Sequence, residues 1–215
     1  MRVFVTGGSG VLGRAALPLL RVAGHEVVAP ARTELDLFDP AAVARAVAGS
    51  DALLHLATRI PPVAEWALPS AWEANDRLRR DASRHLVDAA LATGTQVYVF
   101  PSGTFLYPAE GAADEDTPVQ VTDLLRSAID GEAEAARFAA AGRTGVVLRL
   151  GHLDGPGTFY SAPNAEGGGT LHADDAGRAL VAALAVQSGT YNVCRDGERV
   201  SNARFRAASG WRPER

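Results

Sequence analysis

The stretch Met1–Arg14, MRVFVTGGSGVLGR, contains the residues that decide the fold. Its apolar run Val3–Thr6 predicts a buried strand, and the apolar spacing after the turn predicts a helix. Between them, Gly7, Gly10 and Gly13 give the pattern GxxGxxG. In such a unit the first glycine permits the tight turn, the second lets backbone approach a pyrophosphate, and the third lets helix and strand pack closely. The segment therefore predicts a dinucleotide site.

The same alternation of short apolar runs and longer helical patterns continues along all 215 residues. Strands are predicted at Val3–Thr6, Glu26–Pro30, Ala52–Leu56, Gln96–Phe100, Gly145–Leu150 and Thr190–Val193. Helices are predicted at Val11–Ala23, Pro40–Ala48, Trp72–Thr93, Thr122–Ala141 and Ala173–Gln187. The apolar runs are continuous, as expected for strands buried on both faces. We therefore predict an α/β fold: one Rossmann-like domain over residues 1–215, with a doubly wound parallel sheet and helices on both faces.

Composition excludes several classes of function. Hydrophobic residues make up 47% and charged residues 21% of the chain, and the net charge of −4 gives no reason to expect a nucleic-acid partner. No apolar run approaches the roughly 20 residues of a membrane helix. The lone Cys194 cannot form an internal disulfide, and no residue cluster has metal-ligand spacing. We expect a cytoplasmic monomer or homodimer that takes small molecules and holds no metal.

Further motifs follow in an order that resembles the extended short-chain dehydrogenase/reductases, the NAD(P)-dependent epimerase/dehydratase family. They are TGGSGVLG at 6–13, LDLFD at 35–39, HLAT at 55–58, WEAN at 72–75, DEDTP at 114–118 and LRLGHLDGPG at 148–157. The resemblance covers nearly the whole chain and implies a nicotinamide cofactor. The cofactor-binding residues that it implies are Gly7, Ser9, Gly10, Val11, Leu12, Gly13, Arg14, Asp36, Leu37, Leu56, Ala57, Thr58, Ser102 and Gly151.

The end of the second predicted strand bears on which cofactor is bound. Proteins that bind NAD place an acid there for the ribose 2′-hydroxyl, whereas a basic residue accommodates the 2′-phosphate of NADP. In EVVAPAR the acid's place is taken by Ala31, and Arg32 follows. This favours NADP(H), with Arg32 as a phosphate ligand. Arg14, directly after the third glycine, either adds to that site or is a solvated helix residue.

The acid–base pair of the family is absent from this chain. Members carry YxxxK, in which the tyrosine is the general acid or base and the lysine lowers its pKa. The corresponding stretch here is LLRSAIDGE at 124–132, where Leu124 replaces the tyrosine and Ala128 the lysine. All 21 Lys and Arg residues of the chain are arginine, so no shift of the alignment recovers the pair.

The substrate lobe of the family is much reduced. Members insert it after GPG, but here Gly157 is soon followed by HADDAGRA at 172–179. The pocket is therefore expected from loops at 60–70, 102–111 and 151–169, and residues 155–169 are predicted to be a substrate loop or lid. These loops supply an apolar wall, which consists of Pro61, Pro62, Trp66, Phe105, Phe159 and Tyr160.

Four residues remain as candidate catalytic groups: Ser102, Thr104, His152 and Tyr160. Ser102 and Thr104 flank Gly103, which falls at the hydroxyl position of the family. A hydroxyl there either hydrogen-bonds a substrate carbonyl or only hydrogen-bonds backbone groups at the end of the strand. His152 and Tyr160 lie in or beside the loop expected over the nicotinamide, where each could donate a hydrogen bond.

Three functions are compatible with this pattern. The first is NADPH-dependent reduction of a ketone on a small, apolar, aromatic, polyketide-like substrate. Its proton would come from water, from His152 or Tyr160, or from a hydroxyl of the substrate itself. The second is a catalytically inactive NADP(H)-binding sensor or regulatory protein, and the third is a cofactor-bound isomerase or cyclase. The first hypothesis is favoured because it also accounts for the aromatic loops.

Overall fold

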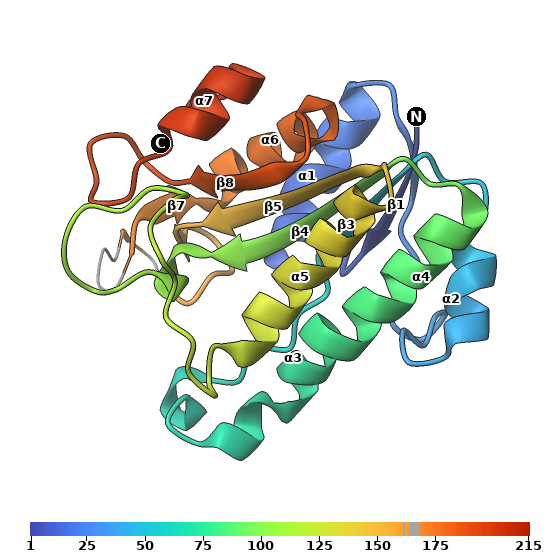
Figure 1. The fold of residues 1–215 in the computed structure, drawn as a ribbon, viewed down its shortest axis with the longest axis horizontal. Coiled ribbons are helices and arrows are strands. Elements are labelled where there is room, and N and C mark those ends of the chain that lie inside the picture. The colour runs from blue at the N-terminus through green and yellow to red at the C-terminus, as the bar shows by residue number, and fades with distance from the viewer. Residues whose placement is uncertain (161, 164–167) are drawn as a thin grey trace.

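The computed structural model describes residues 1–160, 162–163 and 168–215, and a parallel β-sheet forms its centre (Figure 1). Its strands are β1 (Arg2–Thr6), β2 (Glu26–Val28), β3 (Ala52–His55), β4 (Val97–Gly103), β5 (Thr144–Leu150) and β8 (Gly189–Val193). They lie in the order β2-β1-β3-β4-β5-β8, with every neighbouring pair parallel. The order reverses between β1 and β3, and open α/β sheets bind ligands at the carboxyl ends beside such a point.

Helices cover both faces of this sheet, as predicted (Figure 1). One face carries α1 (Val11–Val22) and α6 (Ala173–Ala182). The other carries α2 (Pro40–Val47), α4 (Ser83–Thr93) and α5 (Arg126–Ala140). The predicted Rossmann-like α/β class is therefore confirmed.

The helix before β4 is a composite. It begins with α3 (Glu73–Arg77), continues through one π-helical turn at Leu78–Ala82, and becomes α4. A π-helical turn widens a helix locally and often marks a functional site. This turn lies next to the carboxyl end of β3, because the carbonyl of Leu78 contacts the ring of His55.

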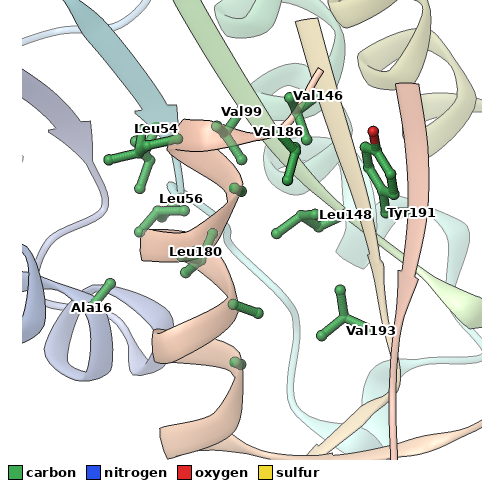
Figure 2. Packing of buried hydrophobic residues seen from close by; sticks show 14 of the residues in the cluster. Ala16, Leu54, Leu56, Val99, Val146, Leu148, Leu180, Val186, Tyr191 and Val193 are labelled. Atoms are coloured by element: carbon green, nitrogen blue, oxygen red, sulfur yellow. The ribbon is translucent and has the colours of Figure 1, made fainter. Parts of the chain in front are cut away.

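The central strands of the sheet bury both of their faces. In β3, Leu54 packs toward α1 and α6, whereas Leu53 packs toward α2 and α4. Figure 2 shows the first of these cores, where strand side chains meet Leu180 of α6. Full burial of a Leu or Val side chain contributes about 1.5–3 kcal/mol. The continuous apolar runs of the sequence are thus explained by a sheet that is covered on both sides.

Three elements were not predicted from the sequence. β6 (His152–Asp154) and β7 (Thr170–His172) form a separate parallel pair, and α7 (Ala203–Ser209) follows β8. Each has only three to seven residues, too few for a periodic pattern to stand out. The predicted helix at 122–141 starts only at Arg126, after a turn in which the Leu125 amide donates to the Thr122 carbonyl.

The predicted substrate loop, residues 155–169, runs between β6 and β7. Part of it, Ser161 and residues 164–167, lies outside the described residues. Its base is fixed by the buried Asp154, whose carboxylate accepts two hydrogen bonds from Arg195, at 2.6 and 3.0 Å. Arg195 also donates to Thr170 Oγ1, at 2.8 Å, and so joins both ends of the loop.

Candidate functional site

A cavity of about 690 Å³ lies at the carboxyl ends of the central strands, within the usual range for small-molecule and cofactor sites of about 300–1,000 Å³. The start of α1, the ends of β4 and β5, and the loops after β3 and β6 form its wall. Many predicted site residues line it together: Gly10, Val11, Leu12, Arg14, Leu56, Thr58, Ser102, Gly151, His152 and Tyr160.

The glycine turn between β1 and α1 can only be made by glycine. Gly7 has a φ of +71°, and a Cβ there would lie 2.6 Å from backbone atoms of Leu56 and Ala57. A Cβ on Gly13 would lie against the carbonyls of Gly7 and Gly8. The first approach packs the turn against the end of β3, and the second packs the start of α1 against the turn.

The first turn of α1 fits an anionic group. Gly10, its N-cap, provides no side-chain hydrogen bond, and the Arg14 amide donates to the Gly10 carbonyl at 2.9 Å. The amides of Val11 and Leu12 precede that bond, and both residues line the cavity. Unpaired amides at a helix N-terminus attract phosphates. The turn and these amides together fit the pyrophosphate of a dinucleotide.

The two predicted phosphate-binding arginines differ in position. Arg14 lines the cavity, where its Nη1 donates to the Ser9 carbonyl at 2.6 Å and its Nη2 lies against Gly157. Arg32 is exposed in the segment after β2 and does not line the cavity.

Five other predicted cofactor residues do not line the cavity: Gly7, Ser9, Gly13, Asp36 and Leu37. Asp36 accepts a hydrogen bond from the Phe38 amide at 2.9 Å, and the Leu37 carbonyl accepts one from His85 at 3.0 Å. The structure therefore gives both residues local partners in the segment before α2.

Ala57 also lies outside the wall, and its amide donates to Thr6 Oγ1 at 3.2 Å. The same Thr6 hydroxyl lies 2.8 Å from Nδ1 of the buried His55, whose Nε2 lies 3.1 Å from the Leu78 carbonyl. Burial lowers the pKa of His55 to about 4, although the bond to Leu78 opposes the shift. His55 is thus neutral at pH 7 and joins β1 to the π-helical turn.

The positions that the family resemblance assigns to the acid–base pair are occupied by hydrocarbon. Leu124 is half exposed and lines the cavity, whereas Ala128 is fully buried in the first turn of α5. At Gly103, the hydroxyl position of the family, the ring of Phe105 fills the space that a side chain would need. None of these three positions carries a group that could donate a proton.

The structure brings three of the four candidate catalytic residues to the cavity wall and leaves Thr104 outside it. Ser102 lines the cavity, and its nearly buried Oγ has no partner among the described residues. Thr104 is fully buried, accepts a hydrogen bond from the Gly169 amide, and does not line the cavity. The rings of His152 and Tyr160 stack with centroids 6.0 Å apart, and both line the cavity.

Tyr107, which matches the tyrosine of a further family motif, is held in a separate buried network. Its hydroxyl donates to Asn192 Oδ1 at 2.8 Å and accepts from Arg149 Nη1 at 2.9 Å. Burial raises the pKa of Tyr107, and the residue does not line the cavity. It is therefore not placed to protonate a molecule bound there.

The predicted aromatic wall is largely present. Trp66, Phe105, Phe159 and Tyr160 line the cavity, whereas Pro61 and Pro62 do not. Trp66 packs edge-on against Phe159, with ring centroids 5.6 Å apart. The Trp66 indole donates to the Pro61 carbonyl at 2.9 Å, so that proline supports the wall from behind.

Several lining residues were missed from the sequence, among them Trp72 and Arg79. The basic run around Arg79 was interpreted as a solvated helix face. Helical spacing does give a signal, because residue 79 falls on the same stripe as the buried Asn75, Ala82, Ser83 and Leu86. Trp72 immediately precedes the composite helix, and its indole donates to the Trp66 carbonyl at 3.0 Å.

Two general properties of the described residues bear on function. They contain no helix that is long and apolar enough to cross a membrane. Within the same residues, no group of three or more His, Cys, Asp and Glu side chains is placed to hold a metal ion.

Comparison with known proteins identifies the family. The model of the NAD dependent epimerase/dehydratase family matches residues 3–166. A Streptomyces protein named 3-diazoavenalumate denitrifying reductase is 33% identical over 220 residues, which cover 86% of this chain and 72% of that protein. A dTDP-4-dehydrorhamnose reductase from Streptomyces griseus is 32% identical over 162 residues, which cover 73% of this chain and 51% of that protein.

Solved structures agree with the fold. The structure of RMD from Pseudomonas aeruginosa complexed with NADPH matches 99% of this chain and 93% of its own, with a TM-score of 0.79 at 19% identity. At that identity the match supports the Rossmann-like fold alone. Taken with the family match over residues 3–166, it leads to one conclusion: the chain belongs to the NAD dependent epimerase/dehydratase family.

Proposed function

We propose that the protein is an NADPH-dependent reductase of a small aromatic substrate, and that its hydride acceptor needs no proton from the protein. One observation carries the proposal: the cavity keeps the glycine turn, but Leu124 and Ala128 stand where the acid–base pair would be. Its cofactor half is lined by residues 10–12, 14, 56 and 58 and lies beside the glycine turn. Its substrate half is lined by residues 66, 72, 79, 102, 103, 105, 124, 159 and 160.

In the cofactor half, the amides at the start of α1 would hold the pyrophosphate. Arg32, which is exposed after β2, would hold the 2′-phosphate and so favour NADPH over NADH. NADPH, when bound, supplies a hydride. The remaining task of the protein is to orient the acceptor and to exclude water, for which the aromatic wall and Leu124 are suited.

The chemistry of the acceptor decides whether an acid is needed. A ketone must gain a hydride and a proton to become an alcohol, so an alkoxide without a donor is strongly disfavoured. An aromatic diazonium group gains only a hydride, because the hydrogen stays on the ring carbon when dinitrogen leaves. A cavity without the acid–base pair of the family therefore suits the second acceptor.

The comparison with known proteins favours the same acceptor. The relative that covers 86% of this chain is named a denitrifying reductase of a diazo compound. Its name thus describes a reduction in which nitrogen is lost. We therefore propose a diazo or diazonium group on an aromatic substrate as the acceptor.

A ketone that carries its own hydroxyl is the second candidate. It is favoured by the relative named for reduction of a dehydro sugar and by the unpartnered Ser102 hydroxyl in the substrate half. Ser102, His152 and Tyr160 would then hydrogen-bond the carbonyl oxygen, while an adjacent phenol of the substrate supplies the proton.

The experiment offers three probes to the protein with NADPH. They are para-carboxybenzenediazonium, ortho-hydroxyacetophenone and acetophenone, and the loss of NADPH absorbance is followed together with the products. We expect reduction of the diazonium to the arene, with dinitrogen released, above the rate without protein. Reduction of acetophenone at a comparable rate would contradict the proposal, because that ketone brings no proton. Tight NADPH binding without turnover of any probe would favour the sensor.

Variants of the polar groups separate the two acceptors. If the diazonium is the acceptor, Ser102→Ala and the double change His152→Asn with Tyr160→Phe should alter its turnover by less than about threefold, since general acid catalysis is worth about 10²–10⁴-fold where it operates. A loss of that larger size would show that the protein supplies the proton after all.

A further inference from the structure

Arg79 projects from the π-helical turn into the cavity. The residue is half-buried, and its guanidinium lies over the ring of Phe105, 5.7 Å from the centroid. Stacking of this kind uses the face of the guanidinium and leaves the N–H groups at its edge free to donate. The side chain therefore presents hydrogen-bond donors to the substrate half of the cavity.

The neighbouring arginines of the same run behave differently. Arg77, Arg80 and Arg84 all form ion pairs with Asp81, at 4.0, 3.1 and 3.7 Å. The guanidinium of Arg79 makes neither an ion pair nor a hydrogen bond within the part of the chain that the structure describes. One arginine of the run is thus directed away from the solvated face and into the cavity.

A nearby carboxylate does not neutralise Arg79. Asp76 raises the pKa of Arg79, but burial lowers it more. Oδ1 of Asp76 accepts a hydrogen bond from Ser127 Oγ at 2.6 Å. A guanidinium stays charged despite such a shift, and a partly desolvated charge without a partner is costly. An anion brought in from outside would remove that cost.

The wall of the cavity supports an anion at this place. Among the described residues that line it, three are arginines, Arg14, Arg59 and Arg79, and none is an aspartate or glutamate. Arg14 is on α1, which covers one face of the sheet, whereas Arg79 leads into α4, which covers the other. Arg14 is accounted for by the cofactor half, and Arg59 is exposed to solvent. Arg79 is therefore the partly buried arginine that the substrate half leaves without a partner.

We propose that the substrate half takes an aromatic carboxylate, with its ring against Trp66, Trp72 and Phe105 and its carboxylate on Arg79. The assignment rests on the proposed reductase function, because it names the substrate class of that same site. A planar guanidinium matches a carboxylate through two parallel N–H bonds. The Ser102 hydroxyl, which also lines this half, is available as a further donor.

Binding without turnover tests the assignment. The protein is saturated with NADP⁺ and titrated with cinnamate and with cinnamamide, which has nearly the same shape but no charge. Quenching of Trp66 and Trp72 fluorescence reports occupancy. We expect cinnamate to bind about 10–100-fold more tightly than cinnamamide. Arg79→Gln should remove this preference, and Arg79→Lys should keep part of it.

Arg80→Gln is the matched control, because it removes a charge from the same turn outside the cavity. It should preserve the preference, and both glutamine variants should show similar melting temperatures and NADP⁺ affinities. Equal binding of the two ligands by the unaltered protein, or a preference that survives Arg79→Gln, would overturn the assignment. A loss of NADP⁺ affinity in Arg79→Gln as large as the loss of cinnamate affinity would overturn it too.

The outcome is separable from that of the proposed function. If the reductase assay fails while cinnamate binding depends on Arg79, the carboxylate site is supported and the proposed hydride transfer is contradicted. If the probes are reduced but cinnamate and cinnamamide bind equally well, the reductase function is supported and the role of Arg79 is contradicted.

Discussion

The two halves of the cavity have diverged from the family to different extents. The cofactor half retains the glycine turn, the open first turn of α1 and the close approach of Gly7 to Leu56 and Ala57. The substrate half has Phe105 over Gly103, and Leu124 and Ala128 stand at the positions that the family resemblance assigns to the acid–base pair. The glycine turn of the family has thus been kept, whereas hydrocarbon stands where the resemblance expects proton-transferring groups.

This difference shows which parts of a site the fold itself constrains. The glycine turn is part of the sheet-to-helix packing, so a side chain there disturbs both the fold and the ligand site. The acid–base pair is carried by side chains on the wall, and apolar residues can take their places without disturbing the backbone. Chemistry can therefore change on a fold that continues to hold the same ligand.

The largest effect is expected for Gly7→Ala in the cofactor half. Its Cβ would lie 2.6 Å from the backbone of Leu56 and Ala57, so the turn must move and NADPH binding should fall below detection in a calorimetric titration. Gly24→Ala is the matched control, because Gly24 also has a positive φ, of +81°, but nothing within 4 Å of a Cβ. It should cost about 1–2 kcal/mol of stability and preserve NADPH affinity. Unchanged NADPH binding by Gly7→Ala would contradict the claim that the fold constrains the glycine turn.

A smaller effect is expected from His55, which joins β1 to the π-helical turn and so links the two halves. Its folded pKa of about 4 lies below the unfolded value of 6.5, so the unfolded chain binds the proton more readily. The stabilisation is present above pH 6.5 and is lost as the pH falls toward 4. Urea unfolding should give a free energy about 2 kcal/mol lower at about pH 5 than at about pH 7.5.

His55→Gln should flatten that dependence, and His85→Gln should retain it. An equal slope in His55→Gln and the unaltered protein would show that the link between the halves does not involve proton binding.

The smallest effect concerns which nicotinamide cofactor is preferred. Arg32→Asp replaces a partner of the 2′-phosphate by a like charge, so the Kd for NADPH should rise about 10–100-fold while that for NADH changes little. Arg21→Asp, at the far end of α1, is the control. An unchanged ratio of the NADPH and NADH affinities in Arg32→Asp would show that Arg32 does not bind the 2′-phosphate.

The sequence predicted the backbone of the glycine turn better than the lining of the substrate half, for a physical reason. The turn at Gly7–Gly13 is local, and its spacing specifies a strand, a turn and a helix at once. The substrate half combines loops after β3, β4 and β6, so no local pattern indicates that Trp72 and Arg79 line the same cavity as Tyr160. Arg79 could not be distinguished within its charged run, because three neighbouring arginines do form ion pairs with Asp81 on the surface.

The central claim is that the protein delivers hydride without an acid of its own. It is tested most directly by the pH dependence of single-turnover reduction of para-carboxybenzenediazonium at saturating NADPH, measured in light and heavy water. We predict a rate constant that is flat from about pH 6 to about pH 9 and a solvent isotope effect of about 1, because no proton moves in the step. A rate that falls with a single pKa, and that slows in heavy water in the same range, would contradict the account.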